Sequence, residues 1–209
     1  MMPVTGDLSI FILTSILLAI APGPDNLYVL TQSALYGVRT GAILTLGLCS
    51  GLIIHIMAVV IGIATLLTTT PVAFILVKVI GASYLLYLAW RALKAQPISA
   101  LTDKRSPHNA IALFRTGFLM NVSNPKVAIF FLAFLPQFVH ADKGHVSLQI
   151  LCLGLIFMAS ALLVFFVVAM SAAKLGNWLI RSSYAQSVLH TLTAVIFILL
   201  AGRLLFTQP

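Results

Sequence analysis

Two charged residues, Asp25 and Lys126, lie inside long apolar stretches and are the first candidates for chemistry. A charge at the centre of a lone membrane helix costs on the order of 2.5–3.5 kcal/mol, so such residues usually face a protein interior and have a function there. Asp25 could take a proton or hold an ammonium group, and Lys126 could hold a carboxylate. The alternative is that the two pair with each other, or that Asp25 only caps a helix.

Each charge lies in a proline motif that should interrupt a helix. Asp25 is part of Pro22-Gly23-Pro24-Asp25-Asn26, and Lys126 ends Asn124-Pro125-Lys126. Proline lacks an N–H and clashes with the carbonyl four residues back, so three carbonyls should lose their helical partner: those of Leu18, Ile20 and Asn121. In a bilayer, such carbonyls are tolerated only inside protein or beside a water-filled cavity.

A new helical segment should begin at each interruption. Asn124 suits the N-cap position with Pro125 in the first helical position, and Pro24 suits that position in the other motif. The free N–H groups and the positive dipole end at a helix start attract anions. A carboxylate could therefore lie between the two starts. The alternative is that both motifs are structural kinks.

The composition requires a bilayer around these segments. Of the 209 residues, 61% are hydrophobic and 8% are charged, whereas soluble domains are about half apolar and about a quarter charged. The formal net charge is +8. In a soluble protein this excess would suggest nucleic acid, but in a membrane protein basic residues collect on cytoplasmic loops. We expect a single transmembrane domain over residues 1–209 that binds no nucleic acid.

Six stretches are apolar and long enough to cross a bilayer, which takes about 20 residues. They are Leu8–Leu35, Gly41–Leu67, Val72–Leu93, Leu113–Val139, Leu148–Ala173 and Val188–Phe206. The polar, basic linker of residues 94–109 separates two halves of three helices, about 1–96 and 110–209. A second connector, Lys174–Gln186, is predicted to form a short helix in the membrane interface. The sequence thus predicts an all-α integral membrane protein of six transmembrane helices, the first and fourth of them broken.

The distribution of lysine and arginine sets the orientation. Eight of them lie near the loops after the first, third and fifth helices: Arg39, Arg91, Lys94, Lys104, Arg105, Arg115, Lys174 and Arg181. The opposite side has only Lys143 and Arg203. Because basic loops stay in the cytoplasm, we expect a cytoplasmic central linker and both termini outside.

Three helices per half is an odd number, so the second half should run inverted relative to the first. A weak internal similarity supports this, with Thr14, Leu17 and Leu18 opposite Thr116, Leu119 and Met120. Paired interruptions in inverted repeats mark the midplane substrate site of secondary transporters. The candidate substrate-binding residues are therefore those of the two motifs: Pro22, Gly23, Pro24, Asp25, Asn26, Asn124, Pro125 and Lys126.

Three further residues are accessory candidates. His55 shares a helix face with glycines, which let helices approach closely, so we expect it to face protein, as a satisfied interior histidine sooner than as a proton relay. Lys78 is more suited to snorkelling to the surface than to a substrate role. Tyr84 lies on the same helix, where Trp90 and Arg91 are typical interface anchors. The sequence has no zinc spacing, phosphate loop or nucleophile triad, so we expect neither an enzyme nor a bound metal or cofactor.

An alternative function is a membrane thiol–disulfide carrier that uses Cys49 and Cys152. The two cysteines lie at nearly equivalent points of the two halves. In such a carrier they should adjoin the helix interruptions, and here they do not. A buried cysteine is also an ordinary small hydrophobic residue, so we favour a transporter.

The two motifs belong to a longer pattern of residues. It comprises Ala21-Pro22-Gly23-Pro24-Asp25-Asn26, Gly37 and Gly41, Lys78-Val-Ile-Gly81-Ala-Ser-Tyr84-Leu-Leu-Tyr87-Leu, Gly117-Phe118, Asn124-Pro125-Lys126, Phe130-Phe131 and Leu135-Pro136-Gln137-Phe138. In these residues the chain resembles the lysine-exporter / homoserine–threonine-resistance (LysE/RhtB) family of bacterial amino-acid exporters. The resemblance covers nearly the whole chain. It implies proton-driven export of amino acids or close derivatives across the inner membrane.

The leading hypothesis is a secondary-active exporter in which the two halves rock around the paired interruptions. The carboxylate of a zwitterionic or cationic amino acid would lie near Lys126 and the helix starts. Its ammonium group would compete with a proton at Asp25. The expected partners are thus an amino acid, protons and the lipid bilayer, and the sequence is compatible with a homo-oligomer.

Overall fold

The computed structural model describes residues 5–66, 71–95, 109–140, 142 and 144–206. All regular structure in these ranges is helical, as predicted. The first half contains α1 (Thr5–Ile20), α2 (Pro24–Tyr36), α3 (Val38–Leu66) and α4 (Pro71–Leu93). The second half contains α5 (Ala110–Val122), α6 (Pro125–Ile129), the π-helical turn η1 (Phe130–Phe134), the 3₁₀ turn η2 (Leu135–Phe138), α7 (Val146–Arg181) and α8 (Ser183–Phe206).

Two of the expected spans are bent at the proline motifs. The helix axis turns by 60° between Leu8–Ile20 and Pro24–Tyr36, and by 47° between Ala110–Val122 and Pro125–Phe138. Four other helices, α3, α4, α7 and α8, contain single stretches that are long and apolar enough to cross a membrane. The described residues thus provide four such helices, or six crossings if each bent pair is one span.

The segment after Asn124 is less regular than the predicted half-helix. The α-helical part ends after five residues at Ile129, and one π-helical turn and one 3₁₀ turn follow. Pro136 explains the change, because it cannot donate to the carbonyl of Leu132 and its ring clashes with that carbonyl. A π turn widens the backbone locally and absorbs this conflict.

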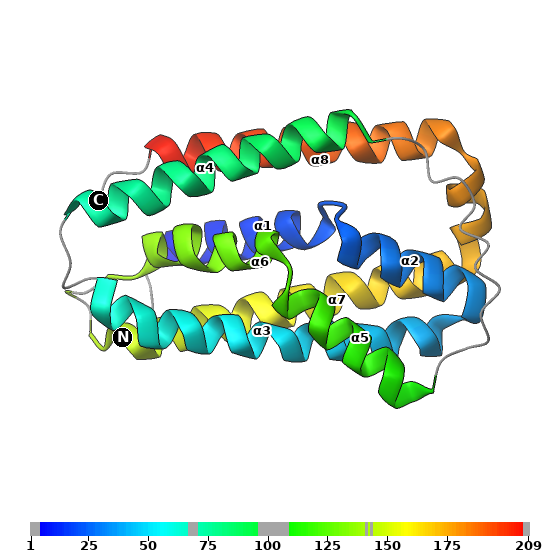
Figure 1. Ribbon diagram of the computed structural model, residues 1–209, viewed down its shortest axis with the longest axis horizontal. Coiled ribbons are helices and arrows are strands. Elements are labelled where there is room, and N and C mark those ends of the chain that lie inside the picture. The colour runs from blue at the N-terminus through cyan, green and yellow to red at the C-terminus, as the bar shows by residue number, and fades with distance from the viewer. Residues whose placement is uncertain (1–4, 67–70, 96–108, 141, 143, 207–209) are drawn as a thin grey trace.

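The second connector also differs from the prediction. Residues 174–186 do not form a separate helix, because α7 continues to Arg181 and α8 begins at Ser183. Figure 1 shows the last part of α7, in orange, turning away from the direction of the rest of the helix toward α8. The connector is therefore helical, as expected, but it is the end of α7.

Helices from the two halves pack on one another. α3 lies along α5, α1 and α2 lie against α7, and α4 lies along α8. In Figure 1 the α4–α8 pair forms one edge of the molecule, and α1 and α6 lie between this pair and the layer of α3 and α7. The halves of the sequence therefore do not form two separate bundles, which matters for how they can move.

Glycines allow close contact between the backbones of α3 and α5. A Cβ atom at Gly47 would collide with the backbone carbonyl of Phe114, and one at Gly117 would collide with that of Leu44. A Cβ at Gly51 would lie 2.8 Å from Cβ of Asn121. Because lipid tails are as apolar as leucine, such close van der Waals packing is a main source of helix association in a bilayer. This contact fixes the position of Asn121, just before the second interruption.

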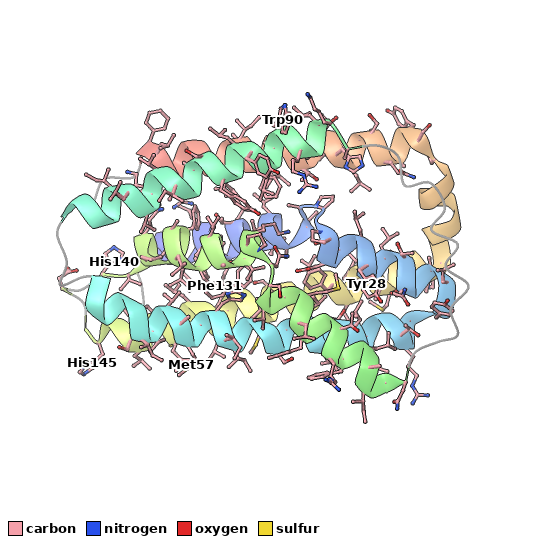
Figure 2. The ribbon with its side chains drawn as sticks, viewed as in Figure 1. Tyr28, Met57, Trp90, Phe131, His140 and His145 are labelled. Atoms are coloured by element: carbon pink, nitrogen blue, oxygen red, sulfur yellow. The ribbon has the colours of Figure 1, made fainter. Side chains whose placement is uncertain are left out.

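An aromatic cluster fills the interior on one side of the interruptions. Its rings pack with centroid separations between 4.8 and 6.3 Å, and its members are Phe11, Phe130, Phe131, Phe134, Phe138 and Phe157. All six side chains are buried. Figure 2 shows Phe131 in the interior, whereas Met57 and Trp90 lie on the outer surface.

Candidate functional site

The two interruptions place Asp25 and Lys126 at the same position of two helix starts. Gly23 is the N-cap of α2 and Pro24 its first residue. Asn124 is the N-cap of α6, as predicted, and its Oδ1 accepts a hydrogen bond of 3.0 Å from the backbone N–H of Lys126. Each charged residue therefore follows the N1 proline directly.

Each of these two residues makes its contacts with the other half of the sequence. Nδ2 of Asn124 donates a hydrogen bond of 2.7 Å to Oδ2 of Asp25. The ammonium of Lys126 donates to the backbone carbonyl of Ala21 at 3.0 Å and to that of Leu18 at 3.3 Å. Asp25, Asn124 and Lys126 are all buried. The two broken helices are thus joined through the polar side chains at their starts.

The carbonyls that proline should free have side-chain partners. That of Leu18 accepts from Lys126. Nδ2 of Asn26 donates to the carbonyl of Ala19 at 2.6 Å and makes a longer contact of 3.5 Å with that of Ile20. The carbonyl of Asn121 lies 3.1 Å from Nε2 of His55, which donates when that nitrogen carries the proton. The freed carbonyls of the interruptions are therefore satisfied by protein side chains.

The position of Lys126 has an electrostatic explanation. A cation in the first turn of α6 is repelled by the positive end of that helix dipole. Its ammonium, however, donates to the carbonyl of Leu18 in the last turn of α1 and to that of Ala21 directly after the helix, at the negative end of the α1 dipole. The sequence suggested Asp25 or a ligand carboxylate as the anionic partner. In the structure, the end of α1 takes this place.

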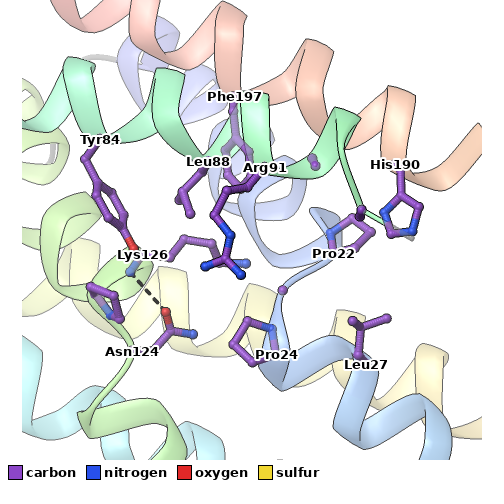
Figure 3. Close-up of a pocket in the computed structure, with 14 residues that line it drawn as sticks. Pro22, Pro24, Leu27, Tyr84, Leu88, Arg91, Asn124, Lys126, His190 and Phe197 are labelled. Atoms are coloured by element: carbon purple, nitrogen blue, oxygen red, sulfur yellow. Dashed lines mark hydrogen bonds between the residues drawn. The ribbon is translucent and has the colours of Figure 1, made fainter. Parts of the chain in front are cut away.

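A cavity of about 450 Å³ opens beside the interruptions. Figure 3 shows the residues that line it, drawn from α2, α4, α6 and α8 and from both motifs. They are Pro22, Gly23, Pro24, Leu27, Tyr84, Leu88, Arg91, Ala92, Ala95, Asn124, Pro125, Lys126, His190 and Phe197. The wall is largely apolar, with a few polar groups that converge on the interruptions. This is the usual make-up of a small-molecule site.

A second, much smaller void of about 20 Å³ includes Asp25 and Asn121 in its lining. Lys126 lines both this void and the larger cavity. Oδ1 of Asp25 and Oδ1 of Asn121 are buried and have no hydrogen-bond partner in the described structure. A carboxylate oxygen without a partner is costly to bury as a charge, so Asp25 is suited to take up a proton.

The structure brings most of the predicted motif residues to the cavity. Seven candidates line it: Pro22, Gly23, Pro24, Asn124, Pro125, Lys126 and the accessory Tyr84. Asp25 lies at the small void. Asn26 and His55 bind backbone carbonyls of the interruptions and are not among the residues that line either space. Lys78, on α4, is also not among them.

Two polar residues of the cavity, Arg91 and His190, were not predicted as site residues. Arg91 was interpreted as an interface anchor beside Trp90, because it lies in the last turn of an apolar helix. Tyr84, Leu88 and Arg91 are spaced at three to four residues and share the cavity face of α4. That spacing was the available signal. Nε2 of His190 is buried with no hydrogen-bond partner among the described residues, and the sequence around His190 gave no signal comparable to the spacing on α4.

The two cysteines are apart from this site. Both thiols are free, Cys49 buried and Cys152 exposed. Neither is among the residues that line the cavity or the small void.

Comparison with known proteins identifies the family. Residues 16–208 match the LysE type translocator family. A leucine efflux protein of Salmonella typhimurium is 32% identical over 203 residues, which is 95% of this chain and 94% of that protein. A homoserine/homoserine lactone efflux protein of Salmonella typhi is 31% identical over 197 residues, 93% of each chain. An uncharacterized membrane protein of Vibrio cholerae is 34% identical over 190 residues, 90% of each chain.

No solved structure matches this chain. The match to the family covers nearly the whole sequence, and both interruptions lie within it. The chain therefore belongs to the LysE type translocator family, and it is a membrane transport protein and not an enzyme.

Proposed function

We propose that this protein is a secondary-active exporter of amino acids or close derivatives in the bacterial inner membrane, with its site at the paired helix interruptions. The observation that carries the proposal is the cavity that both proline motifs line together. Relatives that are named as efflux proteins for leucine and for homoserine and its lactone support the class of substrate.

The packing pattern supports an inverted repeat of three plus three helices. The broken helix of each half packs against the second helix of the other half, α1 and α2 against α7 and α5 against α3. The second helices, α3 and α7, pack on each other, and so do the third helices, α4 and α8. A two-fold relation between inverted halves produces such matched pairs.

This packing favours a different motion from rocking of the two sequence halves. Separating the halves would pull α3 from α5, whose glycines hold the backbones in contact. The α4–α8 pair contributes one wall of the cavity, through Tyr84, Leu88 and Arg91 on α4 and His190 and Phe197 on α8. We infer that this pair moves against the remaining helices to open one side and close the other.

In the expected orientation, the cavity would lie on the side from which an exporter loads. Arg91 and Ala95 in its lining are at the end of α4, next to the central linker, and the charge count assigns that linker to the cytoplasm. On the other side of the interruptions, the aromatic cluster fills the interior. A cavity open to one side and closed on the other is what alternating access requires.

Coupling to protons is assigned to Asp25. Its carboxylate lies behind Lys126 as seen from the cavity, since Lys126 lines both the cavity and the small void. The charge of Asp25 would affect a ligand indirectly, through the positions of Lys126 and Asn124. Both residues line the cavity, and Asn124 donates a hydrogen bond to Asp25. Protonation of Asp25 would weaken both links and thereby alter the cavity.

Transport into inside-out membrane vesicles tests the function. Vesicles with an acidic interior should accumulate radiolabelled leucine against its gradient, and a protonophore should abolish the accumulation. The Cys152→Ser variant is the matched active control, because this exposed thiol is apart from the site. If none of the common protein amino acids accumulates, amino-acid export is overturned; if accumulation persists with the protonophore, only the proton coupling is overturned.

A further inference from the structure

We propose that Arg91 binds the carboxylate of the transported amino acid, and that the cavity selects substrates whose side chain carries no positive charge. This inference deepens the proposed function and rests on it. It changes the assignment made from the sequence, which put the substrate carboxylate on Lys126 and allowed a cationic amino acid.

The charges of the cavity favour an anionic group. Its lining contains two basic side chains, Arg91 and Lys126, and the imidazole of His190, but no aspartate or glutamate. Asp25, the nearest buried carboxylate, lines the separate small void. A ligand that brings a carboxylate therefore compensates the positive charge, whereas one with an additional cation adds to it.

Arg91 is better placed than Lys126 to receive that carboxylate. The ammonium of Lys126 already donates to the carbonyls of Leu18 and Ala21 and is buried. Arg91 is exposed, and Figure 3 shows its guanidinium extending from α4 into the cavity, toward the interruptions. Its aromatic contact with Tyr87 is long, at 6.0 Å from the ring centre. A guanidinium binds a carboxylate through two parallel hydrogen bonds, which an ammonium cannot match.

The rest of the lining suits an uncharged amino acid. Leu27, Leu88 and Phe197 provide an apolar surface for an aliphatic side chain. His190 adds a polar group to the lining, and its Nε2 is buried with no hydrogen-bond partner in the part of the chain that the structure describes. A volume of about 450 Å³ lies within the range of about 300–1,000 Å³ that is typical of small-molecule sites.

Two matched pairs of compounds test the two parts of the inference. Leucine and leucinamide differ in the carboxylate, and norleucine and lysine differ in the side-chain ammonium. Each is added as an unlabelled competitor of radiolabelled leucine in inside-out vesicles that contain the parent protein. Leucine and norleucine should compete well, and leucinamide and lysine should compete poorly. Equal competition within either pair overturns the corresponding part of the inference.

Variants of Arg91 assign the carboxylate preference to this side chain. Arg91→Gln should raise the leucine concentration at half-maximal transport by roughly 10- to 100-fold, the effect of losing a charge-assisted hydrogen bond, and it should reduce the preference for leucine over leucinamide. Arg91→Lys should restore part of both. Lys94→Gln is the matched control, since Lys94 directly follows α4, its ammonium lies over the ring of Trp90, and it is not in the cavity lining.

The outcomes separate this inference from the proposed function. If the parent protein transports leucine and Arg91→Gln keeps the same half-maximal concentration and the same preference over leucinamide, the assignment of Arg91 is overturned and export stands. If the parent transports no amino acid, the proposed function fails and the inference fails with it. Membrane abundance and elution of the solubilised variants show whether a loss comes from misfolding, and the preference ratio is independent of the amount of folded protein.

Discussion

The ammonium of Lys126 donates a hydrogen bond of 3.0 Å to the carbonyl of Ala21, a residue 105 positions earlier in the chain. A helix start in one half of the sequence thereby binds a helix end in the other. The reverse link runs from Asn124 to Asp25, at 2.7 Å. Both links lie beside the cavity. A substitution or protonation that breaks either link should therefore alter the contact between the two broken helices.

Replacement of Lys126 by methionine tests the structural side of this relationship. Methionine has a similar length but donates no hydrogen bond, so the carbonyls of Leu18 and Ala21 lose their side-chain donor in the interior. A buried carbonyl without a partner costs about 1–3 kcal/mol. We expect Lys126→Met to lower the melting temperature of the solubilised protein. Lys94→Met, at an exposed position directly after α4, is the control and should melt like the parent. An unchanged melting temperature for Lys126→Met would show that these bonds do not stabilise the interruption.

Replacement of Asp25 by asparagine separates packing from proton coupling. Asparagine has nearly the same size as aspartate and can still accept a hydrogen bond from Asn124. We therefore expect near-normal abundance of Asp25→Asn. Accumulation driven by a proton gradient should be lost, while exchange of labelled for unlabelled substrate persists and no longer depends on pH. Uphill export by this variant with the pH dependence of the parent would remove Asp25 from the coupling mechanism.

The sequence predicts the interruptions well because proline acts on its own neighbourhood. Local hydrogen bonds are lost at Pro22, Pro24 and Pro125 whatever the tertiary structure is. Asn124 caps a helix that begins one residue later. The partner of Lys126 was not predictable in the same way. It depends on which distant carbonyls face the ammonium, and the sequence offered only charged groups as candidates.

The role of Arg91 shows a second limit of the sequence. A basic residue in the last turn of an apolar helix is typical of a membrane interface, and Trp90 beside it lies on the outer surface as expected. The side chain of Arg91, the next residue, enters the cavity. Only the packing of α4 on α8 determines which face of α4 is turned inward. The prediction of a separate interfacial helix was wrong for a simpler reason: α7 continues through Lys174–Arg181.

The predicted orientation can be tested with introduced cysteines. In a background of Cys49→Ala and Cys152→Ala, single cysteines replace Ser99, Asn109 or Gly144. Ser99 lies outside the described residues and belongs to the central linker. Membrane-impermeant thiol reagents should label the Gly144→Cys variant in intact cells, and should label the other two only after the membrane is opened. Labelling of Ser99→Cys from outside would reverse the assigned orientation.

The native cysteines should be dispensable for transport. Cys49 is buried and Cys152 is exposed, both are free, and neither lines the cavity. A buried cysteine that packs as a small hydrophobic residue is replaced by alanine with little loss. We expect the double variant, Cys49→Ala with Cys152→Ala, to export at close to the parent rate. Loss of export in each single variant at normal membrane abundance would instead favour the thiol–disulfide carrier.

The link between Asp25 and Asn124 can be tested by exchanging the two residues. Asn124→Asp alone retains a good N-cap but places a second carboxylate against Oδ2 of Asp25, where the amide donor of Asn124 now lies at 2.7 Å. Two like charges at this separation in a buried site repel strongly, so this single variant should be the least stable of the set. The double variant, Asp25→Asn with Asn124→Asp, again has one amide and one carboxylate across the gap, with the donor now on α2. It should recover most of the lost stability and abundance. Melting temperatures of the parent, the two single variants and the double variant form a complete cycle, which isolates the interaction between the two positions. If the effects of the single variants simply add in the double variant, the two side chains do not interact, and the direct bond between the broken helices would have to be abandoned.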